Sequence, residues 1–384
     1  MILRAIECRG YKGFGPQTRL PLHKITVLFG KNNSGKTTLA RLPLFAAASL
    51  ANADTMYALT YDSLTFGSSF TDLASVDQPH PQIYFGIEWS RNNRIGIALQ
   101  YVASQKQGGS VQPTRVELDG DVRITIPLQA VRSESAYNQV LLSMSVAQQA
   151  RFQDRIESAA TLLSEIVHIP SARPRIETTY TSRPPVGRTV EEVPYLLASQ
   201  RFLLEDVDRW FRNEFDGASI GVDQAAFAFQ LSETRAGLPV NLSASGRGLQ
   251  AILPVVSLLN EIIQSKRHTQ LIILEEPEAH LHPSLHGVMA DLVITCSRHC
   301  QVIVETHSEN FILRLRRRIA EKRIKHTAIG LYYLDDDRKV QRIKVDDFGT
   351  IDNWPPGVFE SDIEEARAIV EAKLRVMSQL GDTE

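Results

Sequence analysis

The stretch LFGKNNSGKTTLARL, residues 28–42, decides the fold of this chain. Gly30 and Gly35 frame four intervening residues, and Lys36 and Thr37 follow directly, which matches the pattern G-x-x-x-x-G-K-[ST] without a gap. Glycines in such a loop let successive backbone N–H groups point inward at phosphate oxygens. The pattern therefore predicts a phosphate-binding loop (P-loop), in which Lys36 reaches the terminal phosphates of a nucleotide and the Thr37 hydroxyl binds Mg²⁺.

The flanking residues give this loop the setting that it needs. KITVLF, residues 24–29, is apolar and β-branched, as a buried parallel strand should be. Residues 36–53 are rich in Ala and Leu and predict one helix despite Pro43. Strand, loop and helix together outweigh a chance Gly-rich turn. The predicted nucleotide-binding residues are Gly30, Lys31, Asn32, Asn33, Ser34, Gly35, Lys36, Thr37 and Thr38.

A phosphate-binding loop needs an acidic partner strand, and LIILEEPEAHLHP, residues 271–283, provides one. Four apolar residues predict a buried strand whose end presents Glu275 and Glu276, and ligands bind at the carboxyl ends of parallel strands. We expect Glu275 to hold Mg²⁺ and Glu276 to orient and activate the attacking water. A solvated strand end is the alternative for an isolated EE pair.

The next predicted strand, in QVIVETHSEN at residues 301–310, ends at His307. A histidine at this edge of a parallel sheet points toward the same crevice. A neutral imidazole there could donate a hydrogen bond to the γ-phosphate or to its water. The alternative is a histidine that only caps the following helix.

Composition and charge bound the function classes. The 384 residues carry a formal net charge of −2, with 43% hydrophobic and 22% charged residues, which excludes a fibrous or disordered chain and a strongly basic one. No apolar run is long enough to predict a membrane span, and the three cysteines suit a reducing compartment, so we expect a cytoplasmic protein. Packed thiols are a better interpretation of Cys296 and Cys300 than a zinc site with His299.

The pattern of elements predicts an α/β protein in three parts. Residues 1–132 would hold the phosphate-binding loop and an antiparallel β lobe. Residues 133–215 would form an inserted helical subdomain, with helical spacing at residues 145–169 and 192–215 and an irregular Pro- and Arg-rich loop between them. Residues 216–384 would complete the head, because strands and helices alternate as in a mainly parallel sheet.

Residues 30–37, the LIILEEPEAHLHP strand and ETHSENFILRL together resemble the ABC-type ATPases. More narrowly, they are similar to the SMC/RecF/OLD-like branch, as is the opening sequence up to residue 40. Residues 347–366 resemble the tail of short phage-defence-associated ATPases, which end in a Trp-Pro-x-Gly-Phe-like stretch, although Val358 separates the glycine from Phe359 here. The resemblance implies an ABC-type P-loop ATPase head that uses ATP and Mg²⁺ and forms a homodimer or higher oligomer around ATP.

Such a family also implies a signature segment that completes the site of the opposite subunit. LSASGRGLQAILPVV, residues 242–256, is the candidate, with Ser245, Gly246, Arg247 and Gly248 facing the γ-phosphate. Arg247 interrupts the glycine pair, and Ser243 is a rival for the serine role. The family's Q-loop glutamine is not located, since GSSFTDLA at residues 67–74 contains none and Gln78 lies slightly beyond.

The expected function is an ATPase (ATP and water to ADP and phosphate) that regulates a separate effector, a nuclease or toxin, in anti-phage defence. The alternatives are an SMC/RecF-like ATPase that acts directly on DNA in repair, and a binding module in which ATP is only structural. A basic helix at residues 314–325 could contact nucleic-acid phosphates or be a solvated face. LDDDRK, residues 334–339, predicts a hairpin turn in preference to a metal site.

Overall fold

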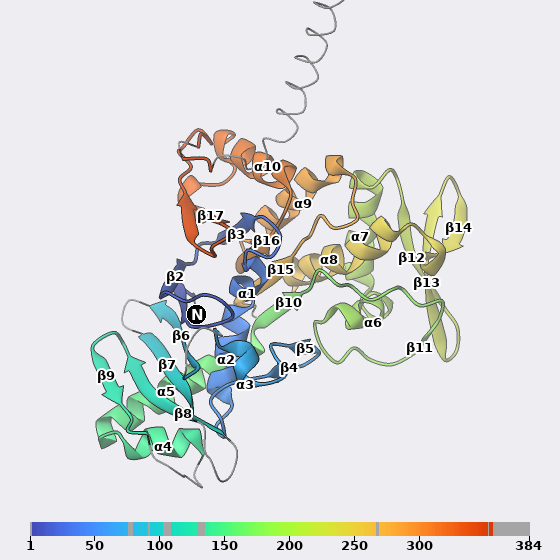
Figure 1. Ribbon diagram of the computed structural model, residues 1–384. Helices are drawn as coiled ribbons and strands as arrows, with labels where there is room; N and C mark the ends of the chain where they lie inside the picture. Colours follow the sequence, from blue (N-terminus) through green and yellow to red (C-terminus); the bar gives the residue numbers. More distant parts are fainter. Residues whose placement is uncertain are drawn as a thin grey trace, which may run out of the picture.

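The computed structural model describes residues 2–75, 80–90, 93–102, 109–128, 135–265, 269–351 and 353–355 (Figure 1). Gln78 and residues 356–366 of the tail lie outside these ranges. Among the helices that are described, none is both long and apolar enough to cross a bilayer.

A mainly parallel sheet forms the centre of the fold. Its strand order is β10-β15-β16-β3-β17-β18, and only β18 runs antiparallel to its neighbour. The predicted parallel sheet is thereby confirmed, and β16 lies between the strand of the phosphate-binding loop and the acidic strand. The strands are β3 (Ile25–Gly30), β10 (Ile166–Ile169), β15 (Leu271–Glu275), β16 (Gln301–Glu305), β17 (Ile329–Leu334) and β18 (Val340–Ile343).

Both faces of the central sheet are buried, which explains why its strands are continuous apolar runs. Ile272 and Leu274 belong to one hydrophobic core, and Leu271 and Ile273 belong to a second core on the other face. The first core includes α8, α9 and α10, and the second includes α1 and α2 (Figure 1). These helices are α1 (Lys36–Ala40), α2 (Leu42–Ala51), α8 (Arg247–Gln264), α9 (Pro283–Cys296) and α10 (Glu309–Ala320).

The predicted single helix after the phosphate-binding loop is wrong, because the chain forms two helices that meet at Arg41. Pro43 lies in the first turn of α2, where its missing N–H costs no hydrogen bond. The Arg41 backbone closes α1 by donating to the carbonyl of Thr37. The break leaves the Arg41 side chain free to reach the central sheet.

The second core continues into the predicted antiparallel lobe, which the structure confirms. Its sheet has the order β2-β1-β6-β7-β8-β9, and α2 contacts its strands β1 and β6. The strands are β1 (Ala5–Arg9), β2 (Thr18–Pro21), β6 (Gln82–Ser90), β7 (Asn93–Val102), β8 (Ser110–Leu118) and β9 (Val122–Thr125). Between α2 and β6, the chain forms a hairpin of β4 (Thr60–Tyr61) and β5 (Leu64–Thr65) and then the short helix α3 (Phe70–Leu73).

The middle of the chain is helical in part. Its helices are α4 (Ala136–Leu142), α5 (Val146–Ser164), α6 (Val193–Ser199) and α7 (Arg201–Glu214), with a 3-10 turn η1 (Val190–Glu192) before α6. The helix predicted through residue 169 is too long. Residues 166–169 form β10 instead, because Val167 and Ile169 alternate with half-buried residues and pair in parallel with β15. The boundaries of a helical insert at residues 133 and 215 remain a prediction.

A small antiparallel sheet precedes the signature segment. β13 (Ala228–Arg235) pairs with β11 (Tyr180–Thr181), β12 (Ser219–Gln224) and β14 (Leu238–Asn241). The 3-10 turn η2 (Leu242–Ala244) then leads directly into α8. The third 3-10 turn, η3 (His326–Ala328), joins α10 to β17.

Candidate nucleotide and metal site

The phosphate-binding loop connects β3 to α1 at the carboxyl end of the central sheet. Gly30 has φ of +145° and Gly35 has φ of +92°, conformations that favour glycine. A Cβ atom at Gly30 would lie 2.3 Å from the carbonyl oxygen of Leu334, and one at Gly35 would lie 2.7 Å from the Phe14 ring. The two glycines are therefore required both by the loop's backbone and by the packing behind it.

Lys36 and Ser34 are buried within this loop. The Lys36 side chain donates from Nζ to the carbonyl oxygen of Lys31 at 2.5 Å, and burial lowers its pKa despite the nearby Glu305 and Glu276. The Ser34 hydroxyl oxygen is buried and has no hydrogen-bond partner among the described residues. A covered hydroxyl donor that no protein acceptor satisfies suits an anionic ligand.

Thr37 contacts a carboxylate that the sequence analysis did not select. Its hydroxyl donates to Glu305 Oε1 at 2.7 Å, and Glu305 ends β16, level with Leu28 of β3 and Glu275 of β15. Burial raises the pKa of Glu305 to about 7, against the hydrogen bond from Thr37. The available signal was the acidic residue directly before Thr306, at the carboxyl end of an apolar strand, where parallel strands bind ligands.

Glu275, the predicted Mg²⁺ ligand, is fully buried and held by other side chains. Arg41 donates to its two carboxylate oxygens at 2.5 Å from Nε and 2.7 Å from Nη2, and His168 Nε2 lies 2.8 Å from Oε1. Burial alone would raise the pKa of Glu275, but the hydrogen bonds from Arg41 and His168 lower it to about 2. The structure brings Glu305, and not Glu275, into hydrogen-bond contact with Thr37.

The ion pair of Glu275 and Arg41 predicts a dependence of stability on pH. Because the pKa of Glu275 is lower in the folded protein than the ordinary 4.5, the pair stabilises the fold above about pH 4.5 and loses this contribution as pH falls toward 2. We expect Glu275→Gln to lower the free energy of unfolding at pH 7 by about 3 kcal/mol, because Arg41 loses its charged partner. Urea unfolding from pH 7 to pH 3 measures this. The variant's stability should fall less steeply with acid than the wild type's, and parallel curves would contradict the prediction.

Glu276 adopts a backbone conformation that is rare for a side-chain-bearing residue, with φ of +41°. Its N–H donates to the carbonyl of Glu305, and Arg173 Nη2 donates to the carbonyls of Glu275 and Glu276 at 2.8 and 2.9 Å. This turn ends β15 and carries the Glu276 carboxylate away from the strand. The Glu276 side chain is 37% exposed and its Oε1 lies 3.9 Å from His307 Nε2, so the predicted base and the predicted histidine do converge.

His307 is positioned by a carboxylate from the acidic segment. Glu278, which is buried, accepts hydrogen bonds from the Thr306 hydroxyl and the His307 N–H, each at 2.7 Å. Burial lowers the pKa of His307, as does Lys36, while Glu276 raises it, so the imidazole is neutral near pH 7. A neutral ring with a partly exposed Nε2 can donate one hydrogen bond to a phosphate or to water.

The donor set at this edge fits a hard divalent cation. Ligand atoms of Glu276, Glu305 and His307 lie within 4.8 Å of one another, and the Thr37 hydroxyl contacts Glu305. Mg²⁺ prefers oxygen ligands and keeps several waters and phosphate oxygens, so two or three protein oxygens suffice. Thr37 and the acidic side chains would hold the cation, which supplies charge neutralisation for the phosphates when bound.

The predicted signature segment starts α8 and lies outside hydrogen-bond range of the loop. No hydrogen bond or ion pair joins Ser245–Gly248 to residues 30–38 within the described chain. The Ser245 hydroxyl is buried without a partner, and the exposed Arg247 begins the helix. Gln250 Nε2 donates to the carbonyls of Ser243 and Ser245, which fixes the turn. Gln250 was missed by the sequence analysis, although it lies only two residues after Gly248.

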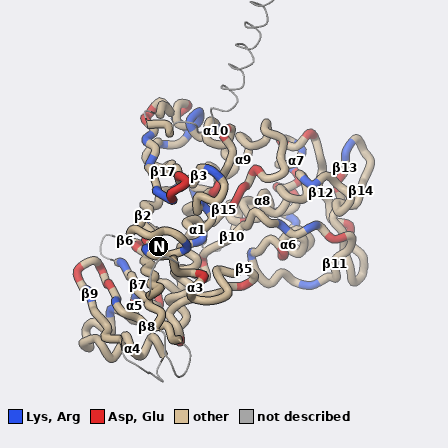
Figure 2. The backbone as a smooth tube through the Cα atoms, viewed as in Figure 1, with Lys and Arg blue, Asp and Glu red and all other residues tan. Residues whose placement is uncertain are grey.

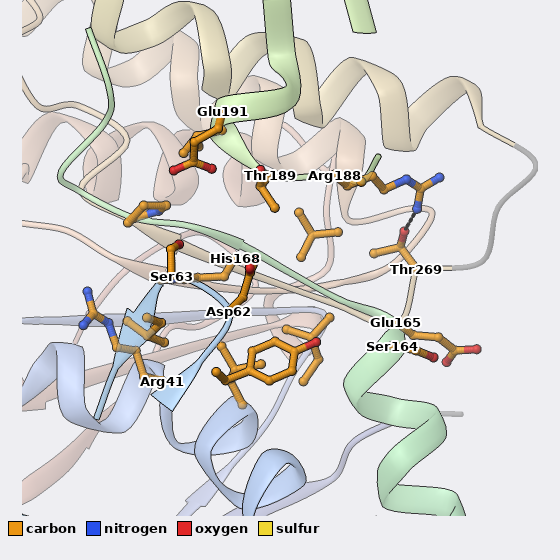
Figure 3. A pocket seen from close by; sticks show the side chains of 18 of the residues that line it. Arg41, Asp62, Ser63, Ser164, Glu165, His168, Arg188, Thr189, Glu191 and Thr269 are labelled. Carbon is orange, nitrogen blue, oxygen red and sulfur yellow. Dashed lines mark hydrogen bonds between the residues drawn. The ribbon is translucent and has the colours of Figure 1, made fainter. Parts of the chain in front are cut away.

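A pocket of about 820 Å³ lies beside the ion pair of Glu275, and not at the phosphate-binding loop. Arg41, His168, Asp62 and Ser63 line one part of it, and Arg188 and Thr269 line another, joined by a hydrogen bond of 2.6 Å (Figure 3). We base the nucleotide site on the loop, because the loop combines the buried, unpartnered Ser34 hydroxyl with the Glu305 carboxylate that Thr37 contacts.

Three other sequence-level candidates have ordinary structural roles. Residues 335–339 form the turn between β17 and β18, as predicted, and Asp336 pairs with Lys31 at 2.9 Å. Cys296 and Cys300 are buried free thiols with sulfurs 3.9 Å apart, and His299 does not join them in a metal-binding group among the described residues. Trp354, near the end of the described chain, stacks on Phe29 with ring centroids 5.5 Å apart, directly behind the loop.

Comparisons with known proteins relate part of the chain to ATPase domains. A family model described as AAA ATPase domain matches residues 200–312, which include Ser245, Glu276 and His307. No curated protein matches the chain at a significant level.

Solved structures of SMC heads resemble the chain over most of its length. An SMC head bound to the C-terminal winged-helix domain of ScpA has a TM-score of 0.55 at 15% identity, covering 90% of this chain and 98% of that one. An SMC head derived from Pyrococcus furiosus has a TM-score of 0.48 at 13% identity, covering 97% and 99%, and one from Thermotoga maritima has 0.43 at 13%, covering 90% and 100%. The chain therefore has a mixed α/β fold that matches the fold of an SMC head.

Proposed function

We propose that this protein is a Mg²⁺-dependent ATPase that dimerises around ATP and controls a separate effector protein. One observation carries the proposal. The phosphate-binding loop, the Glu276 carboxylate and the neutral His307 imidazole meet at one edge of the central sheet, and His307 lies 3.9 Å from Glu276. Phosphoryl transfer requires positioning and charge neutralisation more than covalent chemistry, so this set is sufficient for hydrolysis.

Each residue has a defined task in the proposed reaction. The loop N–H groups and Lys36 bind the phosphates, and Thr37 helps to hold the cation. Glu276 orients the attacking water and takes up its proton, while His307 Nε2 donates a hydrogen bond to the γ-phosphate. A role for ATP as a structural ligand alone leaves the exposed Glu276 carboxylate and its left-handed backbone without a purpose.

Dimerisation is supported by the signature segment. The Ser245 hydroxyl has no hydrogen-bond partner among the described residues of its own chain, and Arg247 is exposed at the start of α8. A nucleotide bound to the loop of a second copy would satisfy both, together with the free N–H groups of the helix start. We therefore place Ser245, Gly246, Arg247 and Gly248 against the γ-phosphate of the opposite subunit, in a homodimer or higher oligomer.

The proposed partner of this ATPase is a separate effector protein. The similar SMC head is solved with a domain of a second protein, which is a precedent for a partner on this fold. Likeness of the tail to defence-associated ATPases favours a nuclease or toxin as the partner, acting in the cytoplasm. The test is to purify the Glu276→Gln variant, which should hold the ATP-bound state, from its native host and identify bound proteins by mass spectrometry. A complex that forms with ATP and dissociates with ADP is expected. Recovery of the ATPase alone would count against an effector.

Direct action on DNA is the alternative, and the charges of α10 weigh against it. Arg314 and Arg318 both pair with Asp291, and Arg317 pairs with Glu321. Basic and acidic residues are interspersed over the described chain (Figure 2). Arginines that are already paired gain less from backbone phosphates than free ones would.

We therefore expect no DNA-stimulated ATPase activity and only weak DNA binding at 50 mM salt. Fluorescence anisotropy with labelled duplex at several salt concentrations measures this. Tight binding that weakens steeply with salt, with a slope reduced when Arg316, Arg317 and Arg318 are replaced together by alanine, would instead favour the DNA-acting alternative.

A further inference from the structure

We propose that Glu305, at the end of β16, supplies the protein carboxylate that binds the nucleotide-associated divalent cation together with Thr37, and that Glu275 is a positioning residue. This inference rests on the proposed ATPase function and assigns the metal ligand within the same site. It differs from the expectation that Glu275, the last residue of β15, binds the metal.

The first argument is the unsatisfied oxygen of Glu305. The residue is 3% exposed, its Oε1 accepts from Thr37, and its Oε2 is buried without a hydrogen-bond partner. A buried carboxylate oxygen with no donor is costly unless a cation or water completes it. Glu305 belongs, with Glu276 and His307, to the one group of potential metal ligands found among the described residues.

The second argument is the distance between Glu305 and Thr37. The Thr37 hydroxyl oxygen and Glu305 Oε1 are 2.7 Å apart. Neighbouring ligands of an octahedral Mg²⁺ with bonds of 2.0–2.1 Å lie about 2.9 Å apart, so one cation can bind both oxygens with little movement of either side chain. The hydroxyl of a P-loop threonine is a Mg²⁺ ligand, which places the metal beside Glu305.

The Glu275 carboxylate already accepts hydrogen bonds on both of its oxygens. Its two oxygens accept from Arg41 at 2.5 and 2.7 Å, and His168 and the Ser171 N–H add contacts at 2.8 and 3.2 Å. Freeing this carboxylate would leave Arg41 uncompensated in a largely buried place, which is strongly unfavourable. Since Arg41 closes α1, the pair instead fixes the helix that follows the phosphate-binding loop.

With Glu305 as the metal ligand, Glu276 is available to activate the attacking water. Its carboxylate is partly exposed and faces His307, whereas that of Glu305 is covered and faces Thr37. Two neighbouring carboxylates in such different surroundings can take the two separate tasks of metal binding and water activation.

The test uses Mn²⁺ as the probe. The electron paramagnetic resonance signal of free Mn²⁺ reports its affinity for the protein with ATPγS, and nucleotide binding in EDTA is measured separately. Glu305→Gln should weaken Mn²⁺ binding roughly tenfold or more while metal-free nucleotide binding stays within about twofold. The control Glu275→Gln should melt at a lower temperature but keep its Mn²⁺ affinity.

A second pair of variants tests ligation directly. Glu305→Cys should bind Cd²⁺ with ATPγS and develop a near-ultraviolet thiolate-to-cadmium band above the wild-type level, since thiolate prefers the softer metal. Glu275→Cys should develop none. This readout decides the assignment even if Glu275→Gln does not fold.

Unchanged Mn²⁺ affinity in Glu305→Gln, or a cadmium band in Glu275→Cys alone, would overturn the assignment of Glu305. A wild type that binds no nucleotide in EDTA or with Mn²⁺ would overturn the proposed function and this inference with it. Those two failures are distinct, because the first occurs in a protein that still binds nucleotide.

Discussion

Lys36→Ala is expected to reduce ATP hydrolysis by more than about 100-fold, the scale seen when one preorganised charge-stabilising group is removed. Lys36 is buried within the loop, and its ammonium group is held by the Lys31 carbonyl at 2.5 Å, directed into the phosphate-binding turn. Bound phosphates would replace that carbonyl as the partner. The loss should appear both in turnover and in nucleotide affinity, because the lysine contacts the ground state as well.

A coupled phosphate-release assay and equilibrium binding of a fluorescent ATP analogue measure the two effects. Lys339→Ala is the matched control, because Lys339 is an exposed lysine whose contact with Asp337 is loose, at 3.4 Å. The control should keep wild-type turnover, and both variants should melt close to the wild type. Wild-type turnover in Lys36→Ala would refute the nucleotide site at this loop.

Glu276→Gln is expected to bind ATP but to hydrolyse it more than about 100-fold more slowly. The amide keeps the shape of the side chain but cannot accept a proton from water. Because ATP is no longer hydrolysed, the ATP-bound dimer should accumulate. The variant should therefore shift to a larger species with ATP and Mg²⁺ and not with ADP. Light scattering coupled to size exclusion measures the shift, and Glu205→Gln, at an exposed glutamate of α7, is the control. Hydrolysis at the wild-type rate would show that Glu276 is not the base.

Adding Ser245→Arg to Glu276→Gln tests the contact between subunits. The Ser245 hydroxyl is buried without a partner at the start of α8, and a long cationic side chain there would obstruct a second subunit's nucleotide. The double variant should stay small with ATP yet still bind it, since its own loop is unchanged. An ATP-dependent shift of the double variant to the larger species, as large as that of Glu276→Gln alone, would show that Ser245 does not make the contact between subunits.

Much of the fold follows from local sequence patterns. The β3 strand, the phosphate-binding loop and the alternation from α8 to β17 were predictable, because an uninterrupted apolar run and helical spacing each dictate one element. The sheet edge that carries Glu276 and His307 followed as well, since parallel strands align their carboxyl ends. The break at Arg41 was signalled only by Pro43, which a helix can accept in its first turn.

By itself, then, the sequence determined that a phosphate-binding loop and acidic strand ends share one edge of a parallel sheet. Only the tertiary structure decided which acid faces the loop. Glu275 and Glu305 both end apolar strands and are level in the sheet. Arg41 and His168 contact the Glu275 carboxylate, whereas the Thr37 hydroxyl donates a hydrogen bond to Glu305. The partners come from residues 41, 168 and 37, and no periodicity relates such distant positions. The tertiary structure also decided that residues 166–169 form a strand, because their pairing with β15 outweighed their helical spacing.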